Sequence, residues 1–270
     1  HLYINPLNDL GEFTIATHDC LNLPTLIIEA NKPPSWINLY NQIKQEFGTS
    51  RFMLYESLIE QKPHYSDIDI LVVETYENVE YSYCLEKTKI AFRTCYSILD
   101  KMAFLLNDYL QLAIPQEKVY FKSLWYNNNK KELRDFFKTS NNWALRGLYW
   151  LSKDIFEKGD DFNNVIEPEA KELDVLRNHI EHKALKIIST SIKSSFEYQE
   201  EKDIAYTITR EEFEKKTLKL LSLVRSALIY LSLAINQEEQ KREYPKGNLL
   251  PIHMEEIPHY KKGRIQNMWK

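Results

Sequence analysis

The chain has 270 residues, 43% of them apolar and 13% aromatic, so it can bury the core of one large domain and is not a disordered protein. Its net charge of −4 excludes a protein that coats nucleic acid through bulk electrostatics, although a local basic patch stays open. Three cysteines without a CxxC pair indicate neither a disulfide framework nor a zinc site, and we expect no metal and no other cofactor.

The start of the chain and its hydropathy bear on its location. The sequence opens at His1 without a methionine, from which we expect a fragment of a longer protein. No apolar run approaches the ~18 residues of a membrane-spanning helix, and no secretory leader opens the chain. We therefore expect a cytoplasmic protein that does not contact a membrane.

The first 78 residues predict a small extension of mixed α/β structure. Short apolar runs at residues 25–29 (TLIIE) and 69–75 (DILVVET) alternate with turn-prone segments and favour strands. Between them, residues 35–48 (SWINLYNQIKQEFG) predict one helix, with its first serine as the N-cap and its glycine just past the end.

Residues 79–237 have the apolar period of helices and predict a mainly α domain, a four-helix up-and-down bundle. Each of four segments carries one apolar stripe that the others can bury: residues 79–112, 143–159, 168–188 and 209–235. Pro115 marks the end of the first helix, Pro168 suits the first turn of the third, and Thr209 to Glu212 (TREE) match a capping box. One short helix is expected in the polar connector before the second, and residues 238–270 predict an irregular C-terminal tail.

The third helix gathers polar groups in residues 172–188 (ELDVLRNHIEHKALKII). At about 100° per residue, one narrow arc faces the bundle, formed by Leu173, Leu176, Ile180, Ala184 and Ile187. Asn178 and His182 lie almost opposite that arc, and Arg177 lies at its margin. Val175 and Leu185 flank the outward pair, which is typical of a contact surface rather than of a solvated one.

Two simpler interpretations of these residues stay open. Arg177 and Glu181 are four residues apart and can form an ordinary surface ion pair, with the histidines as surface residues. His179 and His182 have a spacing that can hold a metal, but no further ligand in the sequence completes the set.

The segment RNHIEH resembles the signature of the HEPN superfamily (higher eukaryotes and prokaryotes nucleotide-binding), with Arg177, Asn178 and His182 at the motif positions. That motif has an arginine, a polar residue and, four to six positions after the arginine, a histidine on the third helix of four. The chain is also similar to the HEPN subfamily found downstream of tetratricopeptide repeats, in three further segments: YINPLND near the start, AFRTCYSILDKMAFLLNDY on the first helix and LRGLYWLSKD on the second.

The resemblance implies a metal-independent endoribonuclease that works as a homodimer. A histidine can move protons near neutral pH and an arginine can stabilise charge on a phosphoryl group, so His182 and Arg177 would carry the reaction. Asn178 would orient His182 or the phosphate. His179 and Asp100, or Arg93 in place of Asp100, would support the site. The expected products are a 2′,3′-cyclic phosphate and a 5′-hydroxyl.

The partners implied are RNA, a second copy of the chain and an upstream region. Two-fold pairing through the third and neighbouring helices would place two motifs in one cleft. Basic residues on the third and fourth helices would form an RNA-binding rim, unless they are merely solvated: Lys183, Lys186, Lys193, Lys215, Lys216, Lys219 and Arg225. A tetratricopeptide repeat region or another regulatory partner would restrain a toxin or antiviral effector.

Two rival functions remain. A non-catalytic HEPN module would bind RNA, nucleotide or protein partners through the same face. The segment HYSDIDILVVE also resembles a strand of minimal nucleotidyltransferases, in which Asp67 and Asp69 would hold magnesium. Those enzymes place a Gly-Ser turn closer upstream than Gly48 to Ser50 and a third carboxylate on a following strand, so we favour a structural turn and strand here.

Overall fold

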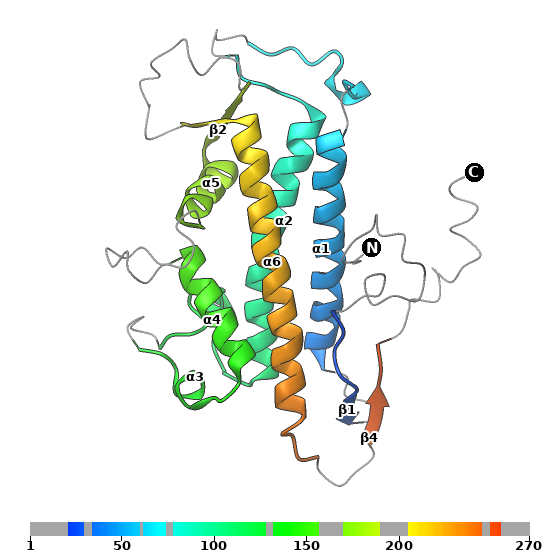
Figure 1. The fold of residues 1–270 in the computed structure, drawn as a ribbon, viewed down its shortest axis with the longest axis vertical. Coiled ribbons are helices and arrows are strands. Elements are labelled where there is room, and N and C mark those ends of the chain that lie inside the picture. The colour runs from blue at the N-terminus through cyan, green and yellow to red at the C-terminus, as the bar shows by residue number, and fades with distance from the viewer. Residues whose placement is uncertain are drawn as a thin grey trace, which may run out of the picture. The chain divides into compact units, whose positions relative to one another are not determined.

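The computed structural model describes residues 21–29, 34–59, 62–73, 78–127, 132–156, 170–189, 205–244 and 249–254. Contacts divide the chain into two compact units, one of residues 35–231 and one of residues 1–34 with 232–270. The described residues are mainly helical with short strands, as predicted (Figure 1). The larger unit includes the long helix that starts at Ser35.

The core helix of the larger unit is α2 (Tyr83–Tyr109). Ser82 caps its start, where the hydroxyl oxygen accepts the N–H of Leu85 at 3.3 Å. The apolar stripe that the sequence predicted is buried along the whole helix: Cys84, Ala91, Phe92, Cys95, Ile98, Leu99, Met102, Leu105, Leu106 and Tyr109. The helical period in the sequence therefore identified the residues of the core.

The end of α2 differs from the prediction, because the helix stops at Tyr109 and not near Pro115. The Asn107 side chain binds both the N–H and the C=O of Ile114, each at 3.0 Å, and so turns the chain back. Gln111 and Ala113 in this turn have φ values of 53° and 54°, which non-glycine residues seldom adopt. Leu112 lies in the turn and outside the helix.

α1 (Ser35–Ile59) packs antiparallel along α2 (Figure 1). The Ser35 hydroxyl donates to the Asp108 carboxylate at 2.9 Å at one end of the pair. The Thr88 hydroxyl donates to the Ser57 hydroxyl at 3.0 Å near the other end. Two polar links therefore fix the register of the pair, and Ser35 uses its hydroxyl for one of them.

Gly48 does not end this helix, so the predicted stop was wrong. A glycine inside a helix costs about 1 kcal/mol relative to alanine. The residues that follow it continue a buried face, with Ser50 and Leu54 only 1% and 2% exposed. Burial of this second half outweighs the glycine, and the helix continues to Ile59.

Four more helices complete the larger unit. α3 (Asp135–Thr139) is the short helix expected in the connector, and α4 (Trp143–Phe156), α5 (Ala170–His182) and α6 (Arg210–Glu239) match the predicted second, third and fourth helices. Pro168, expected in the first turn of the third, lies outside the described residues. Figure 1 shows α4 and α5 one after the other along one side of α6.

Side-chain oxygens cap two of these helices. The Asn142 side chain accepts the N–H groups of Ala144 and Leu145 at 3.1 and 3.2 Å and begins α4. The Thr209 hydroxyl accepts the N–H of Glu212 at 3.3 Å, so the predicted cap of α6 is confirmed. The sequence therefore located both helix starts correctly.

Ring contacts and one glycine bring the helices together. The Phe92 ring of α2 lies 5.9 Å from the Phe213 ring of α6. α4 approaches α6 so closely that a Cβ atom on Gly147 would lie 2.9 Å from the ring of Tyr230. A larger residue at position 147 would have to displace the Tyr230 ring, so glycine allows this close contact between the two helices.

By length and composition alone, α6 is long and apolar enough to cross a membrane. The sequence pattern had predicted no apolar run of that length. Half of its most apolar stretch is buried inside the protein. Its fully buried side chains include Leu220, Val224 and Leu228. A core position in the bundle accounts for this composition.

The segment after His182 is a strand and not a continuation of the third helix, so that prediction was wrong. β2 (Ala184–Ile188) pairs in parallel with β3 (Ala205–Thr209). The N–H of Glu80 also donates to the carbonyl of Ile187 at 2.7 Å. Ala184 at the start of the strand is exposed, and Ile187 and Ile188 at its end are both buried, so burial increases along the strand and does not alternate.

The segment with Asp67 and Asp69 is a turn followed by an extended chain. Asp67 closes a 3-10 turn (Tyr65–Asp67), and its carboxylate accepts the N–H groups of His64 and Tyr83 at 2.9 and 2.7 Å. The expected turn is therefore present, but residues 69–73 form no strand. Asp69 has a φ of 64° and the next residues are exposed, Leu71 by 98%. Asp67 serves the backbone here.

The smaller unit contains one antiparallel strand pair. β1 (Leu26–Glu29), which the sequence predicted, pairs with β4 (Leu249–Ile252). β4 lies in the segment expected to be irregular, so that part of the tail prediction was wrong. The Thr25 hydroxyl and the His253 Nδ1 atom are 3.0 Å apart beside the pair.

Candidate functional site

α5 places the motif residues on different sides of one short helix. Leu173, Leu176 and Ile180 are buried, as the predicted inward arc requires. Arg177 is half-buried, and Asn178 and His182 are exposed. Neither Asn178 nor His182 has a hydrogen-bond partner among the described residues. Both side chains are therefore open to a ligand or to another protein surface.

Arg177 is held against α2. Its Nη2 atom lies 3.6 Å from Oδ2 of Asp100, and its guanidinium carbon lies 5.2 Å from the centre of the Tyr96 ring. A planar cation between a carboxylate and an aromatic face is restrained in direction, because both contacts favour one orientation. Asp100 and Tyr96 thus position the guanidinium with part of its surface exposed.

Asp100 sits in a partly dry environment. Its Oδ1 atom accepts the backbone N–H of Phe121 at 3.1 Å. Burial raises the pKa of this carboxyl above its usual value, and the bond from Phe121 and the charge of Arg177 act in the opposite direction. The Phe121 N–H and Arg177 therefore offset part of the rise that burial causes in the pKa of Asp100.

Arg93 anchors the other end of the motif. Its Nη2 atom donates to the carbonyl oxygen of Ile180 at 2.6 Å, and its Nε atom lies 3.5 Å from Glu181. The carbonyls in the last turn of a helix lack partners within the helix, and a cation there also suits the helix dipole. Arg93 and Asp100, the two alternatives expected on α2, thus both contact α5.

The suggested ion pair of Arg177 with Glu181 is not the arrangement found. Arg177 pairs with Asp100, and Glu181 pairs with Arg93. Both partners lie on α2, so these charges link two helices. The simple surface interpretation of the motif is therefore excluded for its two charged members.

His179 faces the interior and is only 8% exposed. Its Nδ1 atom lies 2.8 Å from the carbonyl oxygen of Val175, and its ring centre lies 5.4 Å from that of Tyr206 on β3. His182 is exposed, so the two histidines do not converge on one point. No group of three or more potential metal ligands occurs in the described parts of the chain.

The described basic residues of the expected rim lie on different elements. Lys183 follows α5 and Lys186 lies in β2, so neither continues the helix, and Lys193 lies outside the described residues. Lys216 on α6 forms ion pairs with Glu172 and Glu212, and so its charge is balanced. A cavity of about 270 Å³ lies there, with Lys215 and Lys219 in its wall.

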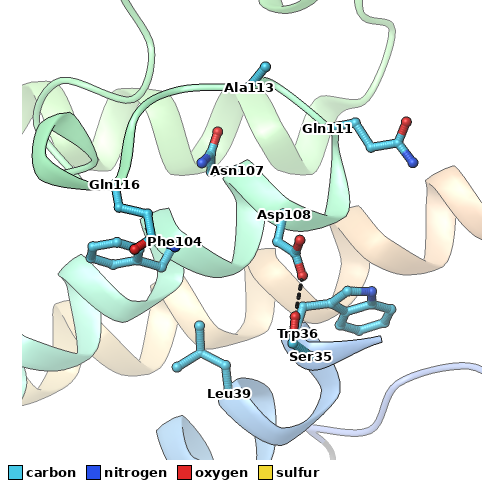
Figure 2. Close-up of a pocket in the computed structure, with 9 residues that line it drawn as sticks. All are labelled: Ser35, Trp36, Leu39, Phe104, Asn107, Asp108, Gln111, Ala113 and Gln116. Carbon is cyan, nitrogen blue, oxygen red and sulfur yellow. Dashed lines mark hydrogen bonds between the residues drawn. The ribbon is translucent and has the colours of Figure 1, made fainter. Parts of the chain in front are cut away.

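A larger cavity of about 430 Å³ lies where α1 begins and α2 ends (Figure 2). Nine residues from these helices and the turn line it: Ser35, Trp36, Leu39, Phe104, Asn107, Asp108, Gln111, Ala113 and Gln116. Figure 2 shows the Ser35–Asp108 bond across it. None of the nine is a histidine, cysteine, lysine or arginine, so this cavity lacks the groups that the expected reaction needs.

The family comparison matches most of the chain. A family model described as LA2681-like HEPN covers residues 27–238. The chain belongs to the LA2681-like HEPN family. Neither the curated proteins nor the solved structures that were compared gave a match. The region that matches this HEPN family includes α1 as well as the bundle and the α5 motif, so the chain carries a HEPN module. Association with tetratricopeptide repeats stays a prediction.

Two members of the site were not found from the sequence, Tyr96 and the backbone N–H of Phe121. Tyr96 precedes Asp100 by one helical turn, so both lie on the same side of α2 and the spacing could have indicated it. The contact with Phe121 comes from the chain after α2 and has no local signal. The sequence predictions for this HEPN site therefore lacked the Tyr96 ring beside Arg177 and the Phe121 N–H that binds Asp100.

Proposed function

We propose that this HEPN module is a metal-independent endoribonuclease. The observation that carries the proposal is the guanidinium of Arg177, held by Asp100 and Tyr96 at the surface of the helix that also exposes Asn178 and His182. An arginine fixed in this way suits a phosphate, because its fork of N–H groups matches two phosphoryl oxygens.

The proposed reaction includes two proton transfers, and one phosphorus–oxygen bond forms while another breaks. The 2′-oxygen of a ribose attacks the adjacent phosphorus and loses its proton to a histidine. The bond from phosphorus to the 5′-oxygen breaks, and that oxygen takes a proton from an acid. The products are a 2′,3′-cyclic phosphate and a 5′-hydroxyl. Arg177 would stabilise the charge on the phosphoryl oxygens and His182 would transfer protons. Asn178 would orient His182 or the phosphate.

A single chain offers too few groups for this reaction, which supports a homodimer. Arg177 and His182 are five residues apart and so point about 140° away from each other around the helix. Pairing α5 with its copy about a two-fold axis would supply two arginines and two histidines to one cleft. Val175, 39% exposed, would lie in that interface. In that cleft a histidine would take the proton of the 2′-hydroxyl as base and pass it, as acid, to the leaving 5′-oxygen.

The test is cleavage of total RNA by the purified protein in excess EDTA, with analysis of the ends produced. We expect cyclic phosphate ends, and we expect His182→Ala to lower the rate by about 10²-fold or more. The fold should persist because His182 is exposed. His253→Ala, at another exposed histidine, is the matched control and should keep full activity.

Other outcomes would point to the rival functions. RNA that stays intact but binds the protein would indicate a non-catalytic HEPN module. Transfer of label from ATP only with magnesium would indicate a nucleotidyltransferase. Full cleavage by His182→Ala would remove His182 from the mechanism. A role as a toxin or antiviral effector, restrained by an upstream region, follows only from the family resemblance and is part of the proposal.

A further inference from the structure

One face of α4 carries two tryptophans and two basic residues. Trp143 and Trp150 are 54% and 43% exposed. Arg146, between them in the sequence, is exposed, and Lys153, after them, is half-buried. Spacings of three, four and three residues keep all four within about 80° around the helix. The opposite side of α4 supplies the buried contacts. We call these four residues the aromatic–basic face.

A cavity of about 240 Å³ adjoins this face. The rings of Phe137, Tyr149 and Trp150 contribute to its wall with Arg146 and Lys138, and no carboxylate lines it. Lys138 pairs with Asp135 at 3.3 Å outside the cavity, so its charge is partly balanced. Arg146 forms no ion pair with any residue in the described ranges.

The rings behind the face are fixed by one another. The centre of the Trp125 ring lies 4.9 Å from that of Phe137 and 5.8 Å from that of Tyr149. The Lys153 Nζ atom lies 5.0 Å from the centre of the Trp150 ring, and Arg146 donates to a backbone carbonyl at 3.1 Å. Trp150, Arg146 and Lys153 therefore have contacts within the protein before any ligand arrives, which lowers the cost of ordering them on binding.

We propose that the aromatic–basic face binds single-stranded RNA, with bases stacked on Trp143 and Trp150 and phosphates beside Arg146 and Lys153. The inference rests on the proposed function in taking RNA as the ligand. Aromatic side chains that alternate with cations suit a single strand, whose bases are free to stack and whose phosphates follow them. The bases of a duplex stack on one another and would not use the rings in this way.

The C-terminal end of α4 lies near the residues that hold the motif of α5. Phe156, the last residue of α4, has its ring centre 6.1 Å from that of Tyr96. The guanidinium of Arg177 lies over that same Tyr96 ring. From Trp143 to Lys153 the helix rises about 15 Å, and α5 follows along the same side (Figure 1). The buried end of α4 is therefore close to the ring that Arg177 covers, and a strand bound along α4 would run toward that end.

Charge favours RNA over a second copy of the chain. Tryptophan and arginine are also common at the centres of protein interfaces. In a symmetric dimer through this face, however, the cations of one copy would lie close to those of the other, which disfavours that contact. A phosphate would neutralise Arg146, which forms no ion pair in the described ranges, so an anionic ligand suits the face better.

The experiment measures binding separately from cleavage. A short, fluorescently labelled single-stranded RNA with 2′-O-methyl riboses cannot react through a 2′-hydroxyl, and its anisotropy reports binding to the full chain. We expect Trp150→Ala and Trp143→Ala each to weaken binding about tenfold, because base stacking is lost. Trp150→Phe should keep most of the affinity, and Arg146→Gln should reduce the salt dependence of binding.

Phe52→Ala is the matched control, because Phe52 is an aromatic residue of α1 that is 54% exposed. It should leave binding unchanged. The inference is overturned if the unmodified protein does not bind the oligonucleotide or if the tryptophan variants bind as well as it does. It is equally overturned if those variants change only the oligomeric state in sedimentation, which would make the face a protein interface. Binding that depends on Trp150 in a protein that cuts no natural RNA would refute the ribonuclease proposal alone.

Discussion

Asp100 determines how the charge of Arg177 is balanced. Its carboxylate has one oxygen near Arg177 and the other on the N–H of Phe121, and its side chain is 26% exposed. Because burial raises its pKa, the folded protein holds the proton of Asp100 more firmly than the unfolded chain does. Ionised Asp100 therefore lowers the stability of the fold, and this effect is absent where both states are protonated.

Asp100→Asn tests this assignment. As pH rises from the ordinary pKa of an aspartate through the raised pKa of Asp100, the folded state of the unmodified protein loses stability relative to the variant. Over this range, we expect the free energy of unfolding of the variant, relative to that of the unmodified protein, to increase as pH rises. The net difference at neutral pH should stay within about 1 kcal/mol, because asparagine can still accept the Phe121 N–H. Chemical denaturation at several pH values measures both; a constant difference across pH would contradict the assignment.

At the scale of the elements, α5 depends on its neighbours. It has 13 residues, and a helix below ~12–15 residues is marginal on its own in water. Arg93 binds its last turn from α2, and Lys216 on α6 pairs with Glu172 near its start. These links, with the buried leucines, hold the motif in place.

Arg93→Ala should loosen the end of α5 without unfolding the bundle. The variant loses a charged donor to the Ile180 carbonyl, worth about 1–2 kcal/mol. We expect faster hydrogen exchange at the last amides of α5 and little change in α2. Lys89→Ala is the control, because Lys89 lies on the same helix and, among the described residues, pairs only with Glu86 in the preceding turn. Equal exchange rates in the two variants would show that Arg93 does not hold α5.

Sequence patterns predicted the elements well where a helix buries one apolar stripe. They failed where the secondary structure of a segment depends on pairing with a distant segment. The periods of α2 and α6 were sufficient to identify their cores. Residues 184–188 fit both a helical arc and a strand, and only pairing with residues 205–209 makes them a strand. In residues 69–73 the apolar run suited a strand, but no described segment pairs with it.

The same limit applies to the candidate site. Arg177, Asn178 and His182 were evident from the motif, and Asp100 was named as a partner on the first core helix. The inward turn of His179 was not foreseen, because it depends on its ring contact with Tyr206 on β3. Contacts of this kind join segments far apart in the sequence and leave no local pattern.

At the scale of the whole molecule, the proposed function requires two chains. We expect Arg177→Ala and His182→Ala each to be inactive, and a mixture of the two to recover part of the cleavage activity. In mixed dimers the arginine of one chain would act with the histidine of the other in a single cleft. Cleavage of a fluorescent RNA in EDTA measures the recovery.

The control mixes Arg177→Ala with the double variant Arg177→Ala/His182→Ala, which supplies no arginine and should stay inactive. Capture of an untagged chain by a tagged one verifies that subunits exchange. A mixture no more active than its components, after exchange is verified, would contradict the shared cleft.

The ion pair between Arg177 and Asp100 has a consequence for ligand affinity. A guanidinium that already has a built-in counter-ion must exchange it for a phosphate when RNA arrives. The phosphate would then displace a carboxylate of the protein from Arg177, and fewer salt ions would be released into solution on binding. Under the proposed function, the affinity at this arginine would depend less on ionic strength than that at Arg146, which has no such carboxylate in the described structure.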